Sequence, residues 1–576
     1  MVFQGLPVSK GVVLGRAFLY TPFKAKVGER YISADERAEH NSRFSEATKK
    51  AGEEIKALQE KMAGEDPDKV GIFEAHEDIL CDAAIIDEIL ELINEKSYDG
   101  EYAVDAVYEK YEQLFAGMDD DLMRERCADF RDVKNRILRI WAGQEEKNLS
   151  QLAHPAVIFA HDLLPSDTAT LNRKNVLAIV TETGGNTSHS AIIARSYEIP
   201  ALLGISGVMA SAQSGMPVIV DALDGVLILG PDEKETAEYE QKRALYLRDL
   251  EQVRAFRSVD PVMADGTRID VFLNIGSVND EELEAAEYTG GVGLFRSEFL
   301  FMQGKDLPGE NQQYQVYKKA VEVYGGRQVI LRTLDIGGDK TFESMDLPEE
   351  DNPFLGCRAL RLCFQKTDVF KTQLRAALRA SVHGNLALMF PMVGSLEDIQ
   401  KAKLYLEECR QELRAEGCPF NEKMPVGIMI EIPAIAVIAD MAVHEVDFAS
   451  IGTNDLCQYL MAVDRLNPNV AAYYQSYNPA MFKLIHQVSR AFEREGKSVS
   501  ICGEMGGDPM AVMAFIGMGI KKFSMTAYNV PAVKRVITKL SMDKARDLVG
   551  KLHALTMAPQ IEEFLKTEME RILADG

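Results

Sequence analysis

The stretch Gly291–Phe299, GVGLFRSEF, joins a short apolar run to an arginine and then to the start of a helix-like segment. The same unit recurs from about Asp260 onward: an apolar run, polar residues where it ends, then a helical stretch. The strands predicted in this way span residues 269–274, 291–295, 328–333, 386–391, 427–432, 447–452, 498–503 and 522–526. Eight such units in about 300 residues predict a (β/α)8 TIM barrel, whose active site lies at the carboxyl ends of the strands.

Residues suited to binding an anion fall at those strand ends. Arg296 ends the second predicted strand, Arg332 ends the third, and Arg358 follows in the loop sequence NPFLGCRALR. Later strand ends and loops supply Glu431, Asn454, Asp455, Arg465 and Cys502. Arginine forks match phosphate and carboxylate oxygens, and a pair of carboxylates suits Mg²⁺, which keeps few protein ligands. The pattern predicts a magnesium-assisted site for a phosphorylated carboxylate.

Each of these residues also has a purely structural interpretation. Arg296 with Glu298, or Arg332 with Asp335, could form ion pairs that only hold the barrel together, and Glu431 could be a similarly paired carboxylate. A lone cysteine is more typical of a small core residue than of an acid or nucleophile. The shared position of these residues at strand ends favours the functional interpretation.

The sequence before the barrel alternates between two characters. Strand-like runs occupy residues 1–20, 157–160, 176–182, 218–222 and 226–229. Helical spacing covers residues 34–62, 67–96, 101–117 and 119–143, which suggests an antiparallel four-helix bundle. The predicted domains are an α/β domain over 1–20 and 144–230, a helical insert over 21–143, a linker helix over 231–259 and the barrel over 260–576.

Inside the α/β domain, Gly184–Arg195 reads GGNTSHSAIIAR. The paired glycines permit a sharp turn, and Thr or Ser before an apolar run is typical of a helix N-cap. His189 then lies in the first helical turn, where free N–H groups favour an anion. Its imidazole is largely neutral near pH 7, so one ring nitrogen can attack. The motif predicts a transient phosphohistidine; a capping loop with an incidental histidine is the alternative.

Composition narrows the classes of function. The chain has 64 basic and 89 acidic residues and a net charge of −25, which argues against nucleic acid or anionic membrane as general partners. Its eight cysteines include no CxxC pair, so neither a zinc site nor a disulfide framework is indicated. The N-terminus lacks the pattern of a signal peptide, and no long apolar run suits membrane insertion. We expect a cytoplasmic protein.

Taken together, the motifs resemble one known family. In matching order the chain carries GGNTSHSAIIAR, GVGLFRSEFLFM, RTLDIGGDK, NPFLGCRALR, FPMV, IGTNDLCQY, AVDR and CGEMGGD. This set resembles Enzyme I of the bacterial sugar phosphotransferase system (PTS), the phosphoenolpyruvate–protein phosphotransferases. The resemblance implies transfer of the phosphoryl group of phosphoenolpyruvate to Nε2 of His189, with release of pyruvate. A histidine of the carrier protein HPr would then receive the group, as the first step of PTS sugar uptake.

The resemblance also implies roles for individual residues and segments. Those that look like phosphoenolpyruvate ligands are Arg296, Arg332, Arg358, Asn454, Asp455 and Arg465. Glu431 and Asp455 look like Mg²⁺ ligands, and Cys502 looks like the acid that protonates the enolate carbon, which suits a thiol mostly protonated at neutral pH. The helical insert looks like an HPr-docking subdomain, and family members are homodimers through the barrel.

Three positions depart from the usual family pattern without removing a catalytic group. Cys357 stands where tryptophan is common, Lys10 where proline is common, and Ser297 where threonine is frequent. Pyruvate phosphate dikinase and phosphoenolpyruvate synthase are alternatives, but these enzymes need a large nucleotide-binding domain. Only about 150 residues precede the histidine domain here, and they are helical in pattern and contain no Gly-rich phosphate loop. A non-catalytic regulator is disfavoured because His189 and Glu431 are both present.

Movement is part of the predicted mechanism. A single histidine that accepts a phosphoryl group at the barrel and delivers it to a separate carrier must reach two distant partners. We therefore predict that the α/β domain swivels, hinged near the helical insert and the helix over 231–256.

Overall fold

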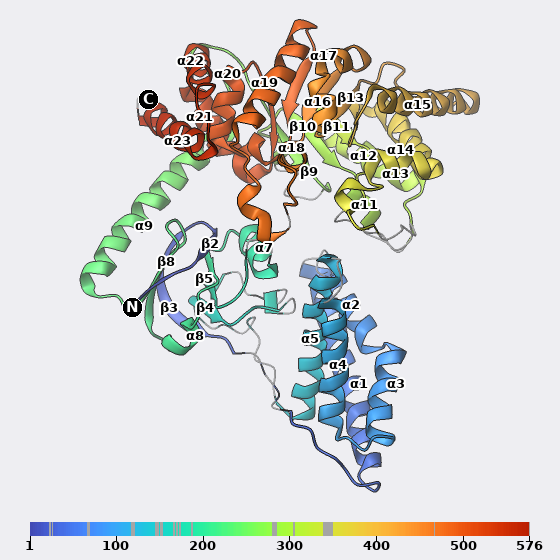
Figure 1. Ribbon diagram of the computed structural model, residues 1–576, viewed down its shortest axis with the longest axis vertical. Coiled ribbons are helices and arrows are strands. Elements are labelled where there is room, and N and C mark those ends of the chain that lie inside the picture. Colours follow the sequence, from blue (N-terminus) through green and yellow to red (C-terminus); the bar gives the residue numbers. More distant parts are fainter. Residues whose placement is uncertain are drawn as a thin grey trace. The chain divides into compact units, whose positions relative to one another are not determined.

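The computed structural model describes the chain apart from residues 22, 24, 26, 66–69, 117–120, 145–148, 150, 151, 153, 165, 166, 169, 170, 172, 173, 186, 187, 279–284, 303–305, 338–349, 466, 575 and 576. The described residues form two compact units, Met1–Asp249 and Leu250–Gly576. Figure 1 draws the first from blue to green and the second from green to red. The finer domain boundaries expected from the sequence stay predictions.

An eight-stranded sheet forms the α/β part of the first unit. Its strands are β1 (Val2–Gln4), β2 (Leu6–Ser9), β3 (Val12–Leu19), β4 (Ala156–Ala160), β5 (Val176–Thr181), β6 (Ala201–Leu203), β7 (Pro217–Asp221) and β8 (Val226–Leu229). Their order is β1-β8-β7-β3-β4-β5-β6-β2. Because successive side chains point to opposite faces, Ile158 of β4 enters one apolar core while Val157 and Phe159 enter the other. The sheet is therefore covered on both faces.

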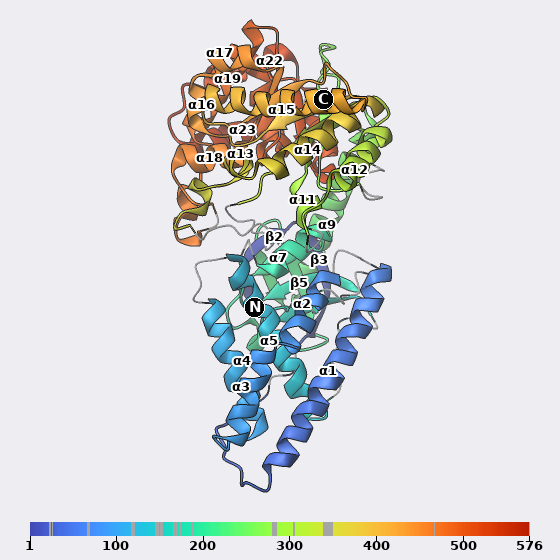
Figure 2. The ribbon, with the colours of Figure 1, turned by 90° about the vertical axis from the view of Figure 1, so that its right-hand side faces the viewer.

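The described part of the helical insert forms five helices, where four were predicted. They are α1 (Arg37–Glu65), α2 (Val70–Leu80), α3 (Ala83–Asn94), α4 (Gly100–Ala116) and α5 (Asp121–Trp141), and Figure 2 shows α3 and α4 side by side with α1 inclined to them. The segment expected as one helix over 67–96 divides at Asp82, whose extended backbone and side chain cap α3 by accepting the N–H groups of Ala84 and Ile85. A strong N-cap starts a new helix there.

Among its described residues, the first unit also contains the helices α7 (His189–Ser196), α8 (Val208–Ser211) and α9 (Glu233–Arg254). None of the residues of α9 is buried, and the helix carries acidic residues in its first turn and Arg254 in its last. Such charges complement the helix dipole. The predicted polar helix over 231–259 is thus present as α9, followed by a short 3₁₀ turn over Ala255–Ser258.

All eight predicted barrel strands are present, and they close into a barrel of parallel neighbours. They are β9 (Asp270–Ile275), β10 (Gly291–Arg296), β11 (Gln328–Arg332), β12 (Leu386–Phe390), β13 (Val426–Ile430), β14 (Phe448–Ile451), β15 (Ser498–Ile501) and β16 (Lys522–Met525). Buried side chains from five strands and the residue after β15 meet in one cluster: Leu294, Ile330, Ala387, Met389, Met429, Phe448 and Cys502. The predicted fold class, with a C-terminal TIM barrel, is confirmed.

Helices surround the barrel in Figure 1. Their bounds are α11 (Glu298–Met302), α12 (Glu310–Val323), α13 (Ala359–Gln365), α14 (Thr367–Ala380), α15 (Leu396–Glu416), α16 (Pro433–Val437), α17 (Ala439–Ala442), α18 (Thr453–Met461), α19 (Pro479–Arg494), α20 (Pro509–Gly517), α21 (Val530–Lys539), α22 (Met542–Leu552) and α23 (Ala558–Ala574). From β10 to β16, successive parallel strands are joined through such helical segments, as a barrel of this kind requires.

Lys534 of α21 makes the stability of this unit sensitive to alkaline pH. It is buried and donates to the carbonyl oxygens of Arg257 and Tyr288, each at 2.8 Å. Burial lowers the pKa of Lys534 to about 8, whereas an unfolded lysine has a pKa of about 10.4. Below both values the buried charge destabilises the fold; between them the native lysine loses its proton first, so stability rises with pH.

We therefore expect the stability of the wild type, relative to Lys534→Met, to rise from about pH 8 to about pH 10. Paired thermal unfolding scans of the two proteins measure this difference directly. Parallel stability curves over that range would contradict it.

Candidate active site

The histidine motif lies in the first unit, at the start of α7. Ser188 is the N-cap, and its hydroxyl oxygen accepts the N–H of Ala191 at 3.3 Å, so the helix begins at His189 as expected. Gly184 adopts a φ of +104°, a conformation that favours glycine. Residues 186 and 187 of the motif lie outside the described residues. The sequence prediction of a capped helix start is confirmed, and the phosphohistidine role of His189 stays a prediction.

Two arginines stand side by side at the carboxyl end of the barrel. Arg296 is the last residue of β10 and is in register with Arg332, the last residue of β11. Arg332 is ion-paired with Glu298, and its Nη1 lies 2.8 Å from Oδ2 of Asp335. The proposed pair between Arg332 and Asp335 is therefore present, whereas Glu298 pairs with Arg332 and not with Arg296. Within the described part of the chain, the Arg296 guanidinium forms no hydrogen bond or ion pair.

The electrostatic environments of these arginines differ accordingly. Burial lowers the pKa of Arg296, and the neighbouring positive charge of Arg332 lowers it further. Burial also opposes the charge of Arg332, but Asp335 and Glu298 outweigh it and hold the pKa of Arg332 above its usual value. A partly buried cation without a protein counterion is costly unless a ligand supplies the negative charge. Arg296 is thus suited to bind an anion.

Arg358 is fixed by contacts on several sides. It precedes α13, is buried, and places Nη2 2.9 Å from Oδ1 of Asp335 and Nη1 3.6 Å from Oδ1 of Asp455. Its Nη1 also donates to the hydroxyl of Tyr459 at 3.3 Å. A Cβ atom on Gly337 would lie 2.6 Å from Cβ of Arg358, so only glycine fits there. Asp335 thereby bridges Arg332 and Arg358 in one buried network.

Two carboxylates face this arginine cluster. Glu431 directly follows β13 and is buried, with Oε1 accepting the N–H of Met392 at 2.5 Å. Asp455 lies in the first turn of α18, and its Oδ1 is 3.3 Å from Nη1 of Arg465. Burial, with the negative charges of Asp455 and Asp335, raises the pKa of Glu431 to about 8. Buried carboxylates that repel each other in this way favour a bound cation.

The donor set fits magnesium better than a metal that needs many side-chain ligands. Among the described residues, no three His, Cys, Asp or Glu side chains gather as a metal cluster. Mg²⁺ typically uses one or two carboxylates and completes its shell with water and substrate oxygens. The pair of Glu431 and Asp455 meets that requirement.

The remaining predicted residues lie at the ends of β14 and β15. The side-chain oxygen of Asn454 accepts the N–H of Glu504 at 2.9 Å, which ties α18 to the chain after β15. The thiol of Cys502 lies 3.5 Å from the carbonyl oxygen of Ile451, and burial raises the pKa of Cys502 to about 11. Cys502 packs in the barrel interior and is also protonated at neutral pH, so it satisfies both interpretations offered by the sequence.

Backbone strain collects around the site. Ala359, Met392 and Ala462 adopt φ angles of +50°, +52° and +50°, a region that non-glycine residues rarely occupy. Ala359 follows Arg358, the N–H of Met392 binds Glu431, and Ala462 closes α18 three residues before Arg465. Strain of this kind persists where surrounding contacts hold functional groups in place. The sequence pattern gave no signal for it.

A buried polar network that the sequence did not reveal supports the Arg332 strand end. The Gln373 amide nitrogen donates to the hydroxyls of Ser297 at 2.9 Å and Tyr317 at 3.1 Å, and its oxygen accepts the N–H of Leu334 at 2.8 Å. Ser297 in turn donates to the carbonyl oxygen of Arg332 at 2.8 Å. Threonine, frequent at position 297 in the family, would carry the same hydroxyl, so this departure preserves the network.

Replacing Gln373 by leucine is expected to destabilise the barrel by about 2–4 kcal/mol, because it removes the acceptor of the buried Leu334 N–H and the donor to two buried hydroxyls. Urea denaturation of the full chain measures the change. Thr372→Val, on the exposed side of the same helix, is the matched control and should alter stability by less than about 0.5 kcal/mol. A Gln373→Leu protein as stable as the control would contradict the expectation.

Comparison with known proteins places this geometry in a family. Three family models match the chain: PEP-utilising enzyme, N-terminal, over residues 4–126; its mobile domain over 152–225; and its PEP-binding domain over 250–542. The phosphoenolpyruvate-protein phosphotransferase of Bacillus sp. (strain S) is 43% identical over 98% of this chain and 97% of its own. The chain belongs to the phosphoenolpyruvate-protein phosphotransferases. The corresponding protein of Bacillus subtilis (strain 168) is 40% identical over 98% of this phosphotransferase and 99% of its own length.

Structural comparison adds an NMR solution structure of an Enzyme I protein, 38% identical to this phosphotransferase. The match covers 42% of this chain and 99% of the chain in that structure, with a TM-score of 0.39. The family models and the full-length relatives confirm the predicted family and phosphotransferase activity, and the closed parallel barrel confirms the predicted fold class. The roles of individual residues stay predictions. Among the described residues of the phosphotransferase, no helix has both the length and the apolar character needed to cross a membrane.

Proposed function

We propose that this phosphotransferase moves the phosphoryl group of phosphoenolpyruvate to Nε2 of His189, releases pyruvate, and then passes the group to a histidine of a small carrier protein of the HPr kind. The observation that carries the proposal is the Arg296 guanidinium, which lies beside Arg332 without a counterion among the described residues. The start of α7 at His189 offers support at the other reactant, because the amino end of a helix favours a phosphoryl group.

Phosphoenolpyruvate binds, in this proposal, at the carboxyl end of the barrel. Its ligands are Arg296, Arg332, Arg358, Asn454, Asp455 and Arg465. The arginines neutralise the phosphoryl and carboxylate charges and hold the phosphorus in line with the attacking nitrogen, which is most of what phosphoryl transfer requires. The buried ion pairs of Arg332 and Arg358 support this role, because they fix both guanidinium groups before substrate arrives.

Glu431 and Asp455 would hold Mg²⁺. The cation would supply charge neutralisation at the phosphoryl and enolate oxygens. The raised pKa of Glu431 supports this assignment, because a buried carboxylate beside Asp455 gains most from a bound cation.

Cys502 completes the chemistry as the proton donor. When the bond between phosphorus and the enol oxygen breaks, phosphorus bonds to Nε2 of His189 and the enolate remains. The thiol of Cys502 then gives its proton to the methylene carbon, which yields pyruvate, and the thiolate recovers a proton from solvent. The high pKa of Cys502 keeps the donor protonated beforehand.

The remaining parts of the proposal concern partners and movement. The helices α1 to α5 dock the carrier, the barrels of two copies form a homodimer, and the enzyme works in the cytoplasm. The match of residues 152–225 to a mobile-domain model supports swivelling of the α/β domain between the barrel and the carrier. Rigid crosslinking of this domain to the barrel should stop transfer to the carrier; unimpaired transfer would exclude the swivel.

Labelling with ³²P-phosphoenolpyruvate and Mg²⁺ tests the central step. The wild type should take up acid-labile label, and His189→Ala should take up none. His161→Ala is the matched control, because His161 is an exposed histidine of the same domain and should leave labelling unchanged. Absence of label on the wild type would overturn the proposed reaction, and undiminished label on His189→Ala would exclude this residue as acceptor.

A further inference from the structure

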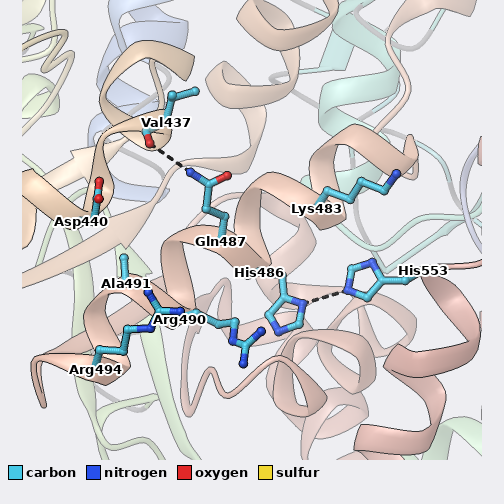
Figure 3. Close-up of a pocket in the computed structure, with 9 residues that line it drawn as sticks. All are labelled: Val437, Asp440, Lys483, His486, Gln487, Arg490, Ala491, Arg494 and His553. Carbon is cyan, nitrogen blue, oxygen red and sulfur yellow. Dashed lines mark hydrogen bonds between the residues drawn. The ribbon is translucent and has the colours of Figure 1, made fainter.

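A second cationic site lies on the outer surface of the barrel unit. A pocket of about 460 Å³ is lined by Val437, Asp440, Lys483, His486, Gln487, Arg490, Ala491, Arg494 and His553 (Figure 3). Most of these residues come from one face of α19, at the spacing of three and four that places side chains along a helix. The opposite face of α19 packs into the core. The volume of the pocket is in the range of small-molecule binding sites.

The charges of this pocket are not balanced by the protein. Lys483, Arg490 and Arg494 form no ion pair or hydrogen bond within the described residues, and Asp440 is the one acid among the lining residues. Elsewhere on the barrel, Arg414 is held by two glutamates. In a chain of net charge −25, three cations without partners around one hollow create a local positive field that attracts an anion.

A histidine pair adds a directional hydrogen-bond donor. Nδ1 of His486 lies 2.8 Å from Nε2 of His553, and the two rings are stacked. Burial lowers the pKa of both rings; the neighbouring His553 and Arg490 lower that of His486 further, Glu493 opposes this, and Lys483 lowers that of His553. In a neutral pair one ring donates to the other, so one of the two outer ring nitrogens always carries an N–H.

The polar groups opposite the cations include hydrogen-bond acceptors, the side-chain oxygens of Gln487 and Asp440. The Gln487 amide nitrogen donates to the carbonyl oxygen of Val437 at 3.0 Å, as the dashed line in Figure 3 shows, and this bond fixes the amide plane. Asp440, next to it in the pocket, is an acceptor for hydroxyl groups. Figure 3 also shows Arg490 extending toward His486, which places one cation beside the histidine pair.

We propose that this pocket binds a small hydroxylated phosphomonoester. The phosphate lies against Arg490 and the histidine pair, where arginine offers a fork suited to phosphate oxygens, and Lys483 adds to the positive field. The hydroxyl groups lie toward Asp440 and Gln487. The site is separate from the phosphoenolpyruvate site at the strand ends, and no group is transferred in it.

The histidine resonances report on this pocket without interference from the other anion site. The full chain, labelled with ¹⁵N-histidine, is titrated with glycerol 3-phosphate, inorganic phosphate, glycerol and succinate; His486→Gln and His553→Gln assign the two imidazoles. Glycerol 3-phosphate should shift both, with a Kd on the order of 1 mM. Inorganic phosphate should bind more weakly, and glycerol should not bind. Succinate shifting both rings as strongly as glycerol 3-phosphate would overturn the phosphate assignment.

Variants test whether binding depends on the charged residues of the pocket and not on the charge of the whole chain. Arg490→Gln/Arg494→Gln should weaken binding at least about tenfold, the loss of about 1.4 kcal/mol expected when charged hydrogen bonds disappear. Asp440→Asn should remove the preference for glycerol 3-phosphate over inorganic phosphate. Arg414→Gln is the matched control and should leave the titration unchanged.

Three further results would overturn the proposal. The first is the absence of histidine shifts with any phosphate compound. The second is an unchanged titration in the double variant. The third is a pair of histidine resonances that shift on dilution of the protein alone, which would assign this face to contact between two copies of the chain.

Discussion

Replacing Arg296 by methionine is expected to lower kcat/KM for phosphoenolpyruvate about 1,000-fold, a loss of about 4 kcal/mol of transition-state binding. The guanidinium has no counterion among the described residues, and its charge is buried beside that of Arg332. Substrate is the partner that makes such an arrangement favourable. Removing the charge should therefore leave the thermal stability of the free enzyme unchanged or raise it, because an uncompensated cation disappears.

Steady-state kinetics and thermal unfolding of the same preparations test both halves of this prediction. Arg414→Met is the control: it breaks two exposed ion pairs and should leave kcat/KM unaltered. If Arg296→Met lowered stability by several kcal/mol or retained full activity, Arg296 would be a structural residue that only helps to hold the barrel together.

The second large effect is expected for Glu431→Gln, which keeps the shape of the side chain and removes its charge. We expect the affinity for a divalent cation to fall at least about 100-fold and activity to fall about 1,000-fold. The amide oxygen can still accept the N–H of Met392, so the local backbone should hold. Without metal, the variant should be at least as stable as the wild type, because repulsion with Asp455 and Asp335 is relieved.

Binding of Mn²⁺, followed by electron paramagnetic resonance, gives a readout independent of turnover. Glu445→Gln is the matched control, since Glu445 pairs with Lys403 away from the cluster. Unchanged Mn²⁺ affinity in Glu431→Gln would show that this carboxylate does not hold the metal.

Much of the barrel could be predicted because its strands are short apolar runs set between helices, and a parallel barrel places all their carboxyl ends together. The helical insert was less predictable in detail. The apolar spacing of residues 67–96 continues across Asp82, so periodicity indicated one helix, while the local cap at Asp82 divides it into two. Strand β6, only three residues long, is too short to show a period.

Which side chains pair with each other in the site could not be predicted from the sequence, for a different reason. Glu298 is two residues from Arg296 but pairs with Arg332 of the next strand, because strand register and not sequence distance decides which groups meet. The support from Gln373 to Ser297 joins residues far apart in the chain. Left-handed residues such as Met392 depend on surrounding contacts, which local sequence does not encode.

The strand order of the first sheet has a consequence for the way the chain acquires its structure. Strand β1 pairs with β8, and the amino group of Met1 donates to the carbonyl oxygen of Leu229, whereas β3 and β4 are neighbours on either side of the helical insert. On the ribosome, the sheet cannot close until Leu229 has emerged, long after the five helices are complete. The helices, rich in local contacts, fold first. The strands before the helical insert therefore stay unpaired until more than half of the unit Met1–Asp249 has been synthesised.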